Sequence, residues 1–324
     1  MGIFVEGRFL DIDSRLLKRD FWQQTLPTLT LSHILKPSDD LVEFDDRELE
    51  GYCNNLRTEA FFITRAVIPL SVCQRIITGI DQICVRRFDA TWTLMFDDCW
   101  LIYSRLRQLI IRMLGDNYQY VTGNYAFVIP NSDTAAGWGV HRDLPYRRSV
   151  RADGMPEIMS FWIALTDATP QNSCLYCLPA SRDPNYPHNL EVHSIPKIED
   201  IECMSVKAGQ LIGLNHALLH WGSRSSSRGQ TRRVSIVFDV QRADVPGYHE
   251  ALVDSNAILS FEQRAAYIAH NILWLNRYNV NFSKPNLDLA AAFVRAFGDS
   301  IGLRKDFLVD YYPASNKEAN FNFG

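Results

Sequence analysis

The sequence predicts a mainly β protein with flanking helices, because its middle part differs in texture from both ends. Between about residues 118 and 242, short β-rich runs alternate with turn residues. The runs cover residues 118–129, 140–143, 158–165, 174–178, 191–194, 204–207, 211–214 and 232–240. Short strands with such regular breaks favour a closed barrel or jelly roll of antiparallel sheets.

Helical patterns precede this core. Residues 60–69 read as a strand that Pro69 stops, and Ser71 is placed to cap a helix whose isoleucines recur at helical spacing. A second helix is expected over residues 102–114, ending at Gly115. The first sixty residues show only weak periodicity, and we expect them to wrap the core.

Helical patterns also follow the core. Residues 261–275 and 287–297 carry apolar side chains at spacings of three and four. No stretch rich in Gly, Ser or Pro separates these helices from the strands. We therefore expect one domain over residues 1–324, with a core at about 118–242 and a C-terminal helical extension at about 250–312.

The composition favours a soluble globular enzyme. Of the 324 residues, 47% are hydrophobic and 22% charged, and the net charge of −4 gives no basic field for nucleic acid or anionic membranes. We find no apolar run of about 18 residues that would span a bilayer. Seven cysteines without a disulfide-like spacing and the absence of a signal sequence predict a reduced, cytoplasmic protein. The pair Cys174 and Cys177 lies in an apolar run, which favours a buried strand over a zinc site.

The residues that carry chemistry are a His-x-Asp pair and a distant histidine. His141 and Asp143 share one face if residues 140–143 are extended, because alternate side chains of a strand point the same way. His220 can approach them from a neighbouring strand. Two histidines and one carboxylate form the triad of non-heme Fe(II) oxygenases, which leaves three positions open for cosubstrate and dioxygen. The sequence therefore predicts an iron site and an oxidation reaction.

A cationic strand begins about a dozen residues after His220, with Arg232 and Arg233 at its start. A guanidinium directed into a barrel is costly unless it meets an anion. A dicarboxylate cosubstrate would supply one, because the guanidinium fork matches carboxylate geometry.

The joint set of motifs resembles the phytanoyl-CoA dioxygenase family of Fe(II)/2-oxoglutarate oxygenases, over roughly residues 58 to 242. The matching segments are His141-Arg142-Asp143, the Trp-x-Ala-Leu-x-Asp strand at 162–167, the turn at 171–182, Ala-Gly-Gln at 208–210, and residues 218–223 with Arg232. Gln171, Ser173, Ala180 and Arg182 depart from the family's turn.

The resemblance implies a double-stranded β-helix core of the jelly-roll or cupin-like kind, with Fe(II) held by His141, Asp143 and His220. A rival ligand, His216, fits the family's connecting segment, so we expect it to be structural. Because Asp143 is retained where halogenating relatives have a small residue, hydroxylation or another oxygen-dependent oxidation is favoured over halogenation.

The resemblance also implies a site for 2-oxoglutarate. Arg232 matches the arginine that binds the distal carboxylate, and Ser223 matches a hydroxyl residue that assists it. Trp162 and Tyr125 are expected to line the pocket. One additional residue before the Gly-Ser pair leaves the arginine register open by one position, with Arg233 as the alternative.

The function that these features predict is oxidation, by hydroxylation in the first instance, of a small organic metabolite with O2, releasing succinate and CO2. The basic cluster at Arg142, Arg147, Arg148 and Arg151 is expected to be a solvated loop, and Arg147 and Arg148 are candidates for selecting an anionic substrate. Two alternatives remain: a peptide or protein hydroxylase with the same metal chemistry, and a non-catalytic binding barrel. We expect no nucleic-acid or membrane partner, and the long C-terminal helices leave a homodimer open.

Overall fold

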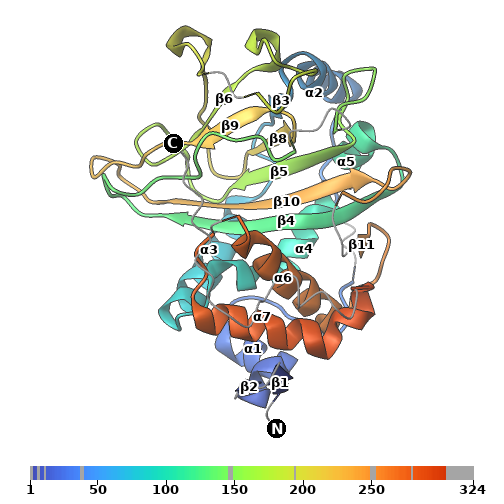
Figure 1. The fold of residues 1–324 in the computed structure, drawn as a ribbon, viewed down its shortest axis with the longest axis vertical. Helices are drawn as coiled ribbons and strands as arrows, with labels where there is room; N and C mark the ends of the chain where they lie inside the picture. Colours follow the sequence, from blue (N-terminus) through green and yellow to red (C-terminus); the bar gives the residue numbers. More distant parts are fainter. Residues whose placement is uncertain are drawn as a thin grey trace.

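Two antiparallel sheets form the centre of the protein, and helices cover the outer face of the larger one (Figure 1). The computed structural model describes residues 3–5, 8–10, 12–36, 40–144, 149–192, 195–248, 253–278 and 280–303. The larger sheet has the strand order β11-β4-β10-β5-β8-β3, and the smaller sheet has the order β7-β6-β9. This arrangement confirms the predicted fold class, a mainly β core of double-stranded β-helix type with flanking helices.

The strands are β1 (Ile3–Val5), β2 (Arg8–Leu10), β3 (Phe61–Ile63), β4 (Tyr118–Ile129), β5 (Ile158–Ala164), β6 (Leu175–Leu178), β7 (Glu202–Met204), β8 (Leu211–Asn215), β9 (Leu219–Gly222), β10 (Arg233–Arg242) and β11 (Val253–Asp254). The α-helices are α1 (Arg19–Thr25), α2 (Asp46–Glu59), α3 (Leu70–Val85), α4 (Asp97–Arg105), α5 (Arg107–Leu114), α6 (Phe261–Asn276) and α7 (Lys284–Phe297). Short 3-10 helices lie at Ser14–Leu17, Ala90–Met95, Ala180–Arg182, Ile198–Asp200 and Gly298–Ile301.

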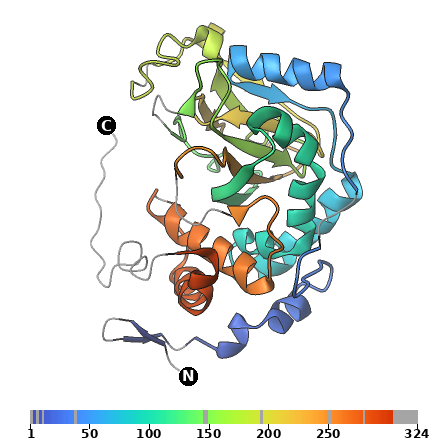
Figure 2. The same cartoon turned by 90° about the vertical axis from the view of Figure 1, so that its right-hand side faces the viewer.

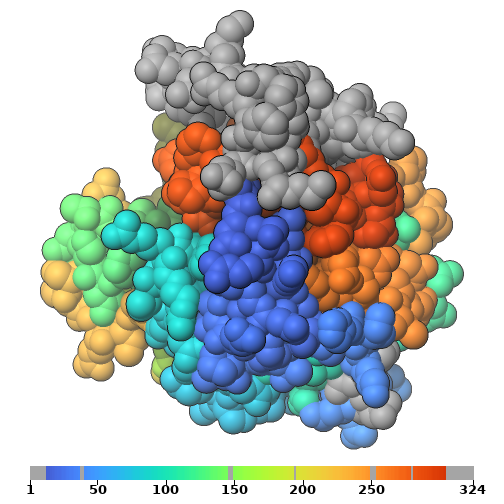
Figure 3. All heavy atoms as spheres, turned by 90° about the horizontal axis from the view of Figure 1, so that it is seen from below, coloured from blue at the N-terminus to red at the C-terminus, as the bar shows by residue number. Residues whose placement is uncertain are grey.

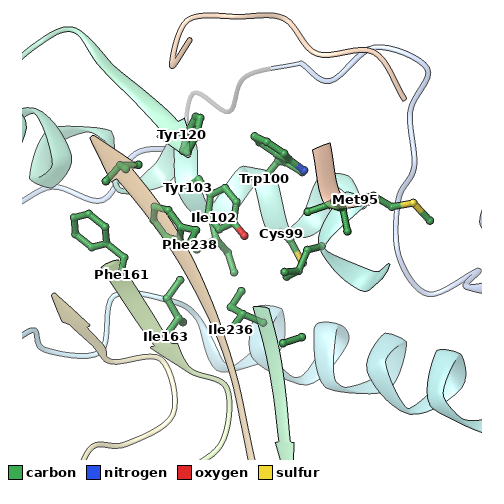
Figure 4. Packing of buried hydrophobic residues seen from close by; sticks show 14 of the residues in the cluster. Met95, Cys99, Trp100, Ile102, Tyr103, Tyr120, Phe161, Ile163, Ile236 and Phe238 are labelled. Atoms are coloured by element: carbon green, nitrogen blue, oxygen red, sulfur yellow. The ribbon is translucent and has the colours of Figure 1, made fainter. Parts of the chain in front are cut away.

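The larger sheet is buried on both faces, and its strands alternate between two environments. On β5, Phe161 and Ile163 point outward into a cluster that includes Trp100 and Tyr103 from α4 (Figure 4). Ser160 and Trp162, which alternate with them along the strand, turn inward toward the smaller sheet. This period of two places the polar functional side chains inside while the helices cover the apolar outer face.

The C-terminal helices complete the cover of the larger sheet. Ser260 and Gln263 form a capping box that begins α6. The N-terminal segment lies against these helices (Figure 3), since the backbone N–H of Phe261 donates to the carbonyl of His33 and the rings of Trp22 and Phe293 are 6.3 Å apart. Helix α2 lies at the opposite end of the molecule, beside β3 (Figure 2). Residues 12–36 and 40–59 therefore cover the core, which is the role predicted for the N-terminal part of the chain.

Several helix predictions need correction. The first sixty residues contain α1 and α2, and the buried side chains of α2 do follow a helical repeat: Leu49, Tyr52, Cys53 and Leu56. Helix α3 begins at Leu70 with Pro69 before it, so Ser71 is not its cap. The helix expected over 102–114 is two helices, α4 and α5, which are separated at Leu106. Helix α4 also begins earlier than predicted, with Asp97 and Asp98 in its first turn, where acidic side chains stabilise a helix.

Two predicted strands are absent from the described residues. Residues 140–143 form only a bridge at His141, and residues 191–192 lie in a turn. Strand β9, which carries His220, was expected only as a neighbour of the His-x-Asp segment. The remaining predicted strands agree with β3 to β8 and β10 within a few residues, apart from the 60–69 run, of which only Phe61–Ile63 is extended.

Candidate metal and cosubstrate site

A pocket lies between the two sheets. Its walls come from β4, β10, β5 and β8 of the larger sheet, from β6 and β9 of the smaller one, and from the segment before β5. The lining residues are Gly123, Phe127, Trp138, His141, Asp143, Ser160, Trp162, Leu175, Leu214, His220, Gly222, Arg233, Val237 and Asp239. All three predicted metal ligands therefore face one pocket, together with one of the two candidate arginines.

The backbone brings His141 next to His220. Their N–H and C=O groups exchange two hydrogen bonds, at 3.0 and 2.9 Å, as in a closely paired antiparallel ladder. The pairing continues at Gly222, whose N–H donates to Trp138. It requires glycine at 137 and 222, because a Cβ on Gly137 would lie 2.6 Å from the Cα of Gly222. The Gly-rich spacing around the motif thus has a structural reason.

Three ligand atoms converge at this point. The potential donors of His141, Asp143 and His220 all lie within 4.8 Å of one another, and no other such group of histidine, cysteine and acidic residues occurs in the described part of the chain. The Nε2 atom of His141 lies 3.4 Å from Asp143 Oδ1, and His220 Nε2 lies 4.0 Å from Asp143 Oδ2. This donor set suits a divalent transition metal with three open positions.

Both imidazoles are oriented for metal binding by their second nitrogen. Nδ1 of His141 lies 2.7 Å from the carbonyl of Gly139, and Nδ1 of His220 lies 3.1 Å from the carbonyl of Leu218. A carbonyl only accepts, so each Nδ1 carries the proton and each Nε2 presents its lone pair to the site. The Nε2 atom of His141 is buried and has no hydrogen-bond partner, as expected of an atom that binds a metal. The residues present fit a metal ion.

The protonation states of His220 and Asp143 suit the same role, whereas a metal ion competes with a proton at His141. Burial, together with the adjacent His141 ring, lowers the pKa of His220 to about 4, so this imidazole is neutral near pH 7. Burial raises the pKa of Asp143, but the neighbouring histidines outweigh it and hold that pKa well below its ordinary value. Burial lowers the pKa of His141, but the adjacent carboxylate of Asp143 raises it by more, so the net shift is upward.

The residue between the two ligands is buried, which corrects the expectation of a solvated basic loop there. The side chain of Arg142 has no exposed surface and forms an ion pair of 2.7 Å with Asp183. It also donates to the carbonyls of Leu190, at 3.1 Å, and Ala217, at 2.6 Å. Arg142 thus ties the His-x-Asp segment to the loop that leads into β9 and His220.

The structure does not support the choice of Arg232 as the pocket arginine. Arg232 forms an ion pair of 2.5 Å with Asp81, and its side chain is 37% exposed. Arg233 is the residue that lines the pocket, with 1% of its surface exposed. The physical reason is the alternation of the strand, which turns neighbouring side chains to opposite faces. The alternative register is the one that brings a guanidinium into the pocket.

Arg233 is an incompletely paired cation. It donates to Ser235 Oγ at 3.0 Å and lies over the rings of Phe127 and Trp162, but its Nε has no hydrogen-bond partner. Among the described residues no carboxylate lies within ion-pair distance of it. Burial lowers the pKa of Arg233 to about 10. A buried guanidinium of this kind is expected to meet an anionic ligand.

The other expected cosubstrate residues divide into two groups. Trp162 lines the pocket, and its Nε1 is buried without a partner. Ser223 follows the lining residue Gly222, and its buried Oγ also lacks a partner. Tyr125 does not line the pocket; it stands behind two pocket aromatics, with ring centroids 4.6 Å from Phe127 and 5.6 Å from Trp138. Arg147 and Arg148 lie outside the described residues.

Sequence reasoning missed a second polar group in the pocket. Ser160 Oγ donates to Asp239 Oδ1 at 2.7 Å and lies 2.9 Å from Nε2 of His216. His216 therefore belongs to this group and not to the metal ligands, in agreement with the structural role expected of it. Asp239 shares the inward face of β10 with Arg233, and that period of two was the signal that would have found it.

A family model described as phytanoyl-CoA dioxygenase (PhyH) matches residues 22–234. The match spans the N-terminal helices, both sheets up to the start of β10, the three metal-ligand candidates and both arginines. A comparison with curated proteins found no match. Within the described part of the chain, no helix is long and apolar enough to cross a membrane.

Solved structures with a similar fold include the following three. The epimerase SnoN, in complex with Fe3+, α-ketoglutarate and nogalamycin RO, is 14% identical and matches 67% of this chain and 97% of its own, with a TM-score of 0.48. AviO1 from Streptomyces viridochromogenes Tue57 is 16% identical, with 63% and 99% covered and a TM-score of 0.49. HygX from Streptomyces hygroscopicus, with nickel, 2-oxoglutarate and hygromycin B bound, is 12% identical, with 64% and 91% covered and a TM-score of 0.43. At these identities the likenesses name no substrate for this chain.

Proposed function

The chain belongs to the phytanoyl-CoA dioxygenase family of Fe(II)/2-oxoglutarate-dependent enzymes, and we propose that it hydroxylates a small organic molecule with release of succinate and CO2. In this proposal His141, Asp143 and His220 hold Fe(II), and Arg233 holds the distal carboxylate of 2-oxoglutarate. The observation that carries it is the presence, in one pocket, of the three-ligand group and a buried arginine without an acidic partner.

The chemistry that such a centre supplies is oxidation of an organic substrate by dioxygen, coupled to conversion of 2-oxoglutarate to succinate and CO2. The chain's own residues bind, orient and exclude water. His141 and His220 direct their Nε2 atoms at the metal because their Nδ1 protons are donated to backbone carbonyls. Asp143 stays ionised and adds one negative charge beside the metal.

The cosubstrate end of the pocket is largely apolar, which strengthens a charge-assisted hydrogen bond between Arg233 and a carboxylate. Phe127 and Trp162 flank the guanidinium at 5.3 and 5.4 Å and keep water away from it. Trp162 Nε1 is a further donor without a partner in the pocket, and Ser223 Oγ, one residue after the lining residue Gly222, also lacks a partner. No side chain is assigned as a general acid or base.

Two alternatives remain distinguishable from this proposal. A peptide hydroxylase would need an open groove, whereas the aromatic and aliphatic side chains of Phe127, Trp138, Leu175 and Leu214 line a pocket between two sheets, which favours a small molecule. A non-catalytic barrel would keep the fold without metal-dependent turnover. The seven free cysteines are consistent with a reduced, cytoplasmic compartment. A homodimer through the C-terminal helices stays a proposal.

The test of this function is succinate release. Purified protein with Fe(II), 2-oxoglutarate and air is expected to form succinate slowly without substrate and faster with one. His220→Ala should abolish the reaction, and Arg232→Ala, at the exposed neighbouring position, should leave it within about twofold. Metal-independent succinate, or full activity in His220→Ala, would contradict the proposed function.

A further inference from the structure

The pocket contains, besides Asp143 and Arg233, a further charged residue that the proposed function does not use. Asp239 lines the same cavity as the metal-ligand group and is 7% exposed. Asp239 and Arg233 share one face of β10 and are six positions apart, or roughly 20 Å at about 3.3 Å per residue. The pocket therefore has a cationic end at Arg233 and an anionic end at Asp239, with the metal ligands also in its wall.

One oxygen of Asp239 is left for a ligand. Oδ1 accepts a hydrogen bond from Ser160 at 2.7 Å, and Ser160 is in turn 2.9 Å from Nε2 of His216. Oδ2 lies 3.6 Å from the same nitrogen, beyond hydrogen-bond distance, and accepts no hydrogen bond from the residues that the structure describes. A carboxylate oxygen normally accepts more than one bond, so Oδ2 can take a donor from the pocket.

The backbone makes room for this carboxylate. The register between β4 and β10 shifts between Val237 and Asp239, so that β4 bulges at residues 122–124. Gly123 lies in the bulge with a φ of 145°, and a Cβ there would lie 1.7 Å from Oδ2 of Asp239. Only glycine leaves space for the carboxylate at this point of the pocket.

Helix α6 holds the bulge in place. The N–H of Gly123 donates to Asn271 Oδ1 at 2.8 Å, and Asn124 Nδ2 donates to the hydroxyl of Tyr267 at 2.7 Å. The hydroxyl of Tyr267 in turn donates to the carbonyl of Val121. Buried polar groups are costly unless they are paired, so these hydrogen bonds from the C-terminal extension hold the bulge of β4 in its position beside Asp239.

Charge balance indicates what Asp239 binds. Fe(II) and 2-oxoglutarate carry opposite double charges, and Asp143 and Arg233 carry opposite single charges, so these four cancel when the site is loaded. Asp239 then remains an anion in a pocket that a substrate closes off from water. A buried carboxylate is stable when a cation reaches it, and Arg233 is too far along the strand to do so. The imidazole of His216, whose Nε2 lies 3.6 Å from Oδ2, is a cation only while it is protonated; burial lowers its pKa, Asp239 raises it, and the net shift is upward. An ammonium group carries its charge across the whole neutral range, so it meets Oδ2 whether or not His216 is protonated.

We propose that Asp239, supported by Ser160, binds a cationic amine on the primary substrate, at the end of the pocket away from Arg233. This inference deepens the proposed function and rests on it. The substrate is then an amine whose oxidised carbon lies between its ammonium group and the cosubstrate, and the ammonium group fixes which carbon faces the metal.

The inference is tested by calorimetry on the anaerobic protein loaded with Fe(II) and 2-oxoglutarate. The probes share one skeleton: cyclohexylamine, cyclohexanol and cyclohexanecarboxylate. Cyclohexylamine is expected to bind at least about tenfold more tightly than the other two. Asp239→Asn should remove that preference, whereas Asp254→Asn, the same substitution at an exposed position, should retain it.

The outcomes separate the two proposals. Before the probes are added, 2-oxoglutarate is titrated into the Fe(II)-loaded protein. Absence of binding in that titration would overturn the proposed function. Binding of 2-oxoglutarate without a preference for the amine, or a preference that persists in Asp239→Asn, would overturn only the assignment of Asp239. The comparison of probes on the unsubstituted protein needs no variant, so it decides the question even if Asp239→Asn does not fold.

Discussion

Arg233→Met is expected to weaken 2-oxoglutarate binding at least about 30-fold without destabilising the ligand-free protein. Burial lowers the pKa of Arg233 from its ordinary value to about 10. At about 1.4 kcal/mol per tenfold change in the proton equilibrium, the fold holds the charged guanidinium about 3 kcal/mol less favourably than water does. Because the folded pKa is the lower one, this cost is fully present at neutral pH and is relieved only as pH rises above about 10.

The magnitude follows from what the substitution removes. Methionine fills similar space with an apolar chain, so most of that cost is relieved, while the contacts of Arg233 with Ser235, Phe127 and Trp162 are lost. The net change in the free energy of unfolding should lie between about 0 and +3 kcal/mol. Loss of a buried charge-assisted bond to the ligand is worth about 2 kcal/mol or more, so the Kd for 2-oxoglutarate should rise at least about 30-fold.

Two assays check this prediction. Urea denaturation without ligand measures the free energy of unfolding, and calorimetry with Fe(II) measures the Kd for 2-oxoglutarate. Arg232→Met is the matched control, because its guanidinium is partly exposed beside Asp81, and both quantities should change little. The reasoning is refuted if Arg233→Met binds 2-oxoglutarate normally, or if the Arg232 variant is the one that loses it.

Three further outcomes are expected. Arg142→Met leaves Asp183 as a buried, unpaired carboxylate, which should cost about 3–5 kcal/mol in urea denaturation and weaken Fe(II) binding; an unchanged unfolding midpoint would contradict this. Fe(II) affinity should fall about tenfold per pH unit below the raised pKa of His141, because one proton competes with the metal, and a flat profile between pH 5 and 8 would exclude His141 as a ligand. Gly137→Ala should lower Fe(II) affinity at least about tenfold, since its Cβ would force Gly222 away, and wild-type affinity would show that the pairing is not needed.

The metal-ligand candidates could be predicted from sequence because their geometry is local. His141 and Asp143 are two residues apart, and the Gly-rich flanks of the motif allow the close pairing that brings in His220. The arginine could be predicted only to within one position. Its register depends on where β10 begins, and the structure starts that strand at Arg233, not at Arg232.

Features that depend on remote partners were not predictable from the sequence. Arg142 reads as a member of a basic cluster, yet it is buried because Asp183 and two carbonyls meet it there. Asp97 and Asp98 lie before the helix expected from residue 102, but they begin α4 and accept hydrogen bonds from the backbone at Ser32 and Thr30. The alternation of β10 predicts that Asp239 points inward, but the bulge in β4 that makes room for its carboxylate cannot be read from the sequence.

The central claim is that His141, Asp143 and His220 form one iron centre that also takes 2-oxoglutarate. Anaerobic titration followed by visible absorption tests it most directly. A weak charge-transfer band should appear only when Fe(II) and 2-oxoglutarate are both present, and it should saturate at amounts equimolar with the chain. The band should be lost in His141→Ala and in His220→Ala. No band in the unsubstituted protein, or an undiminished band in either variant, would contradict the account.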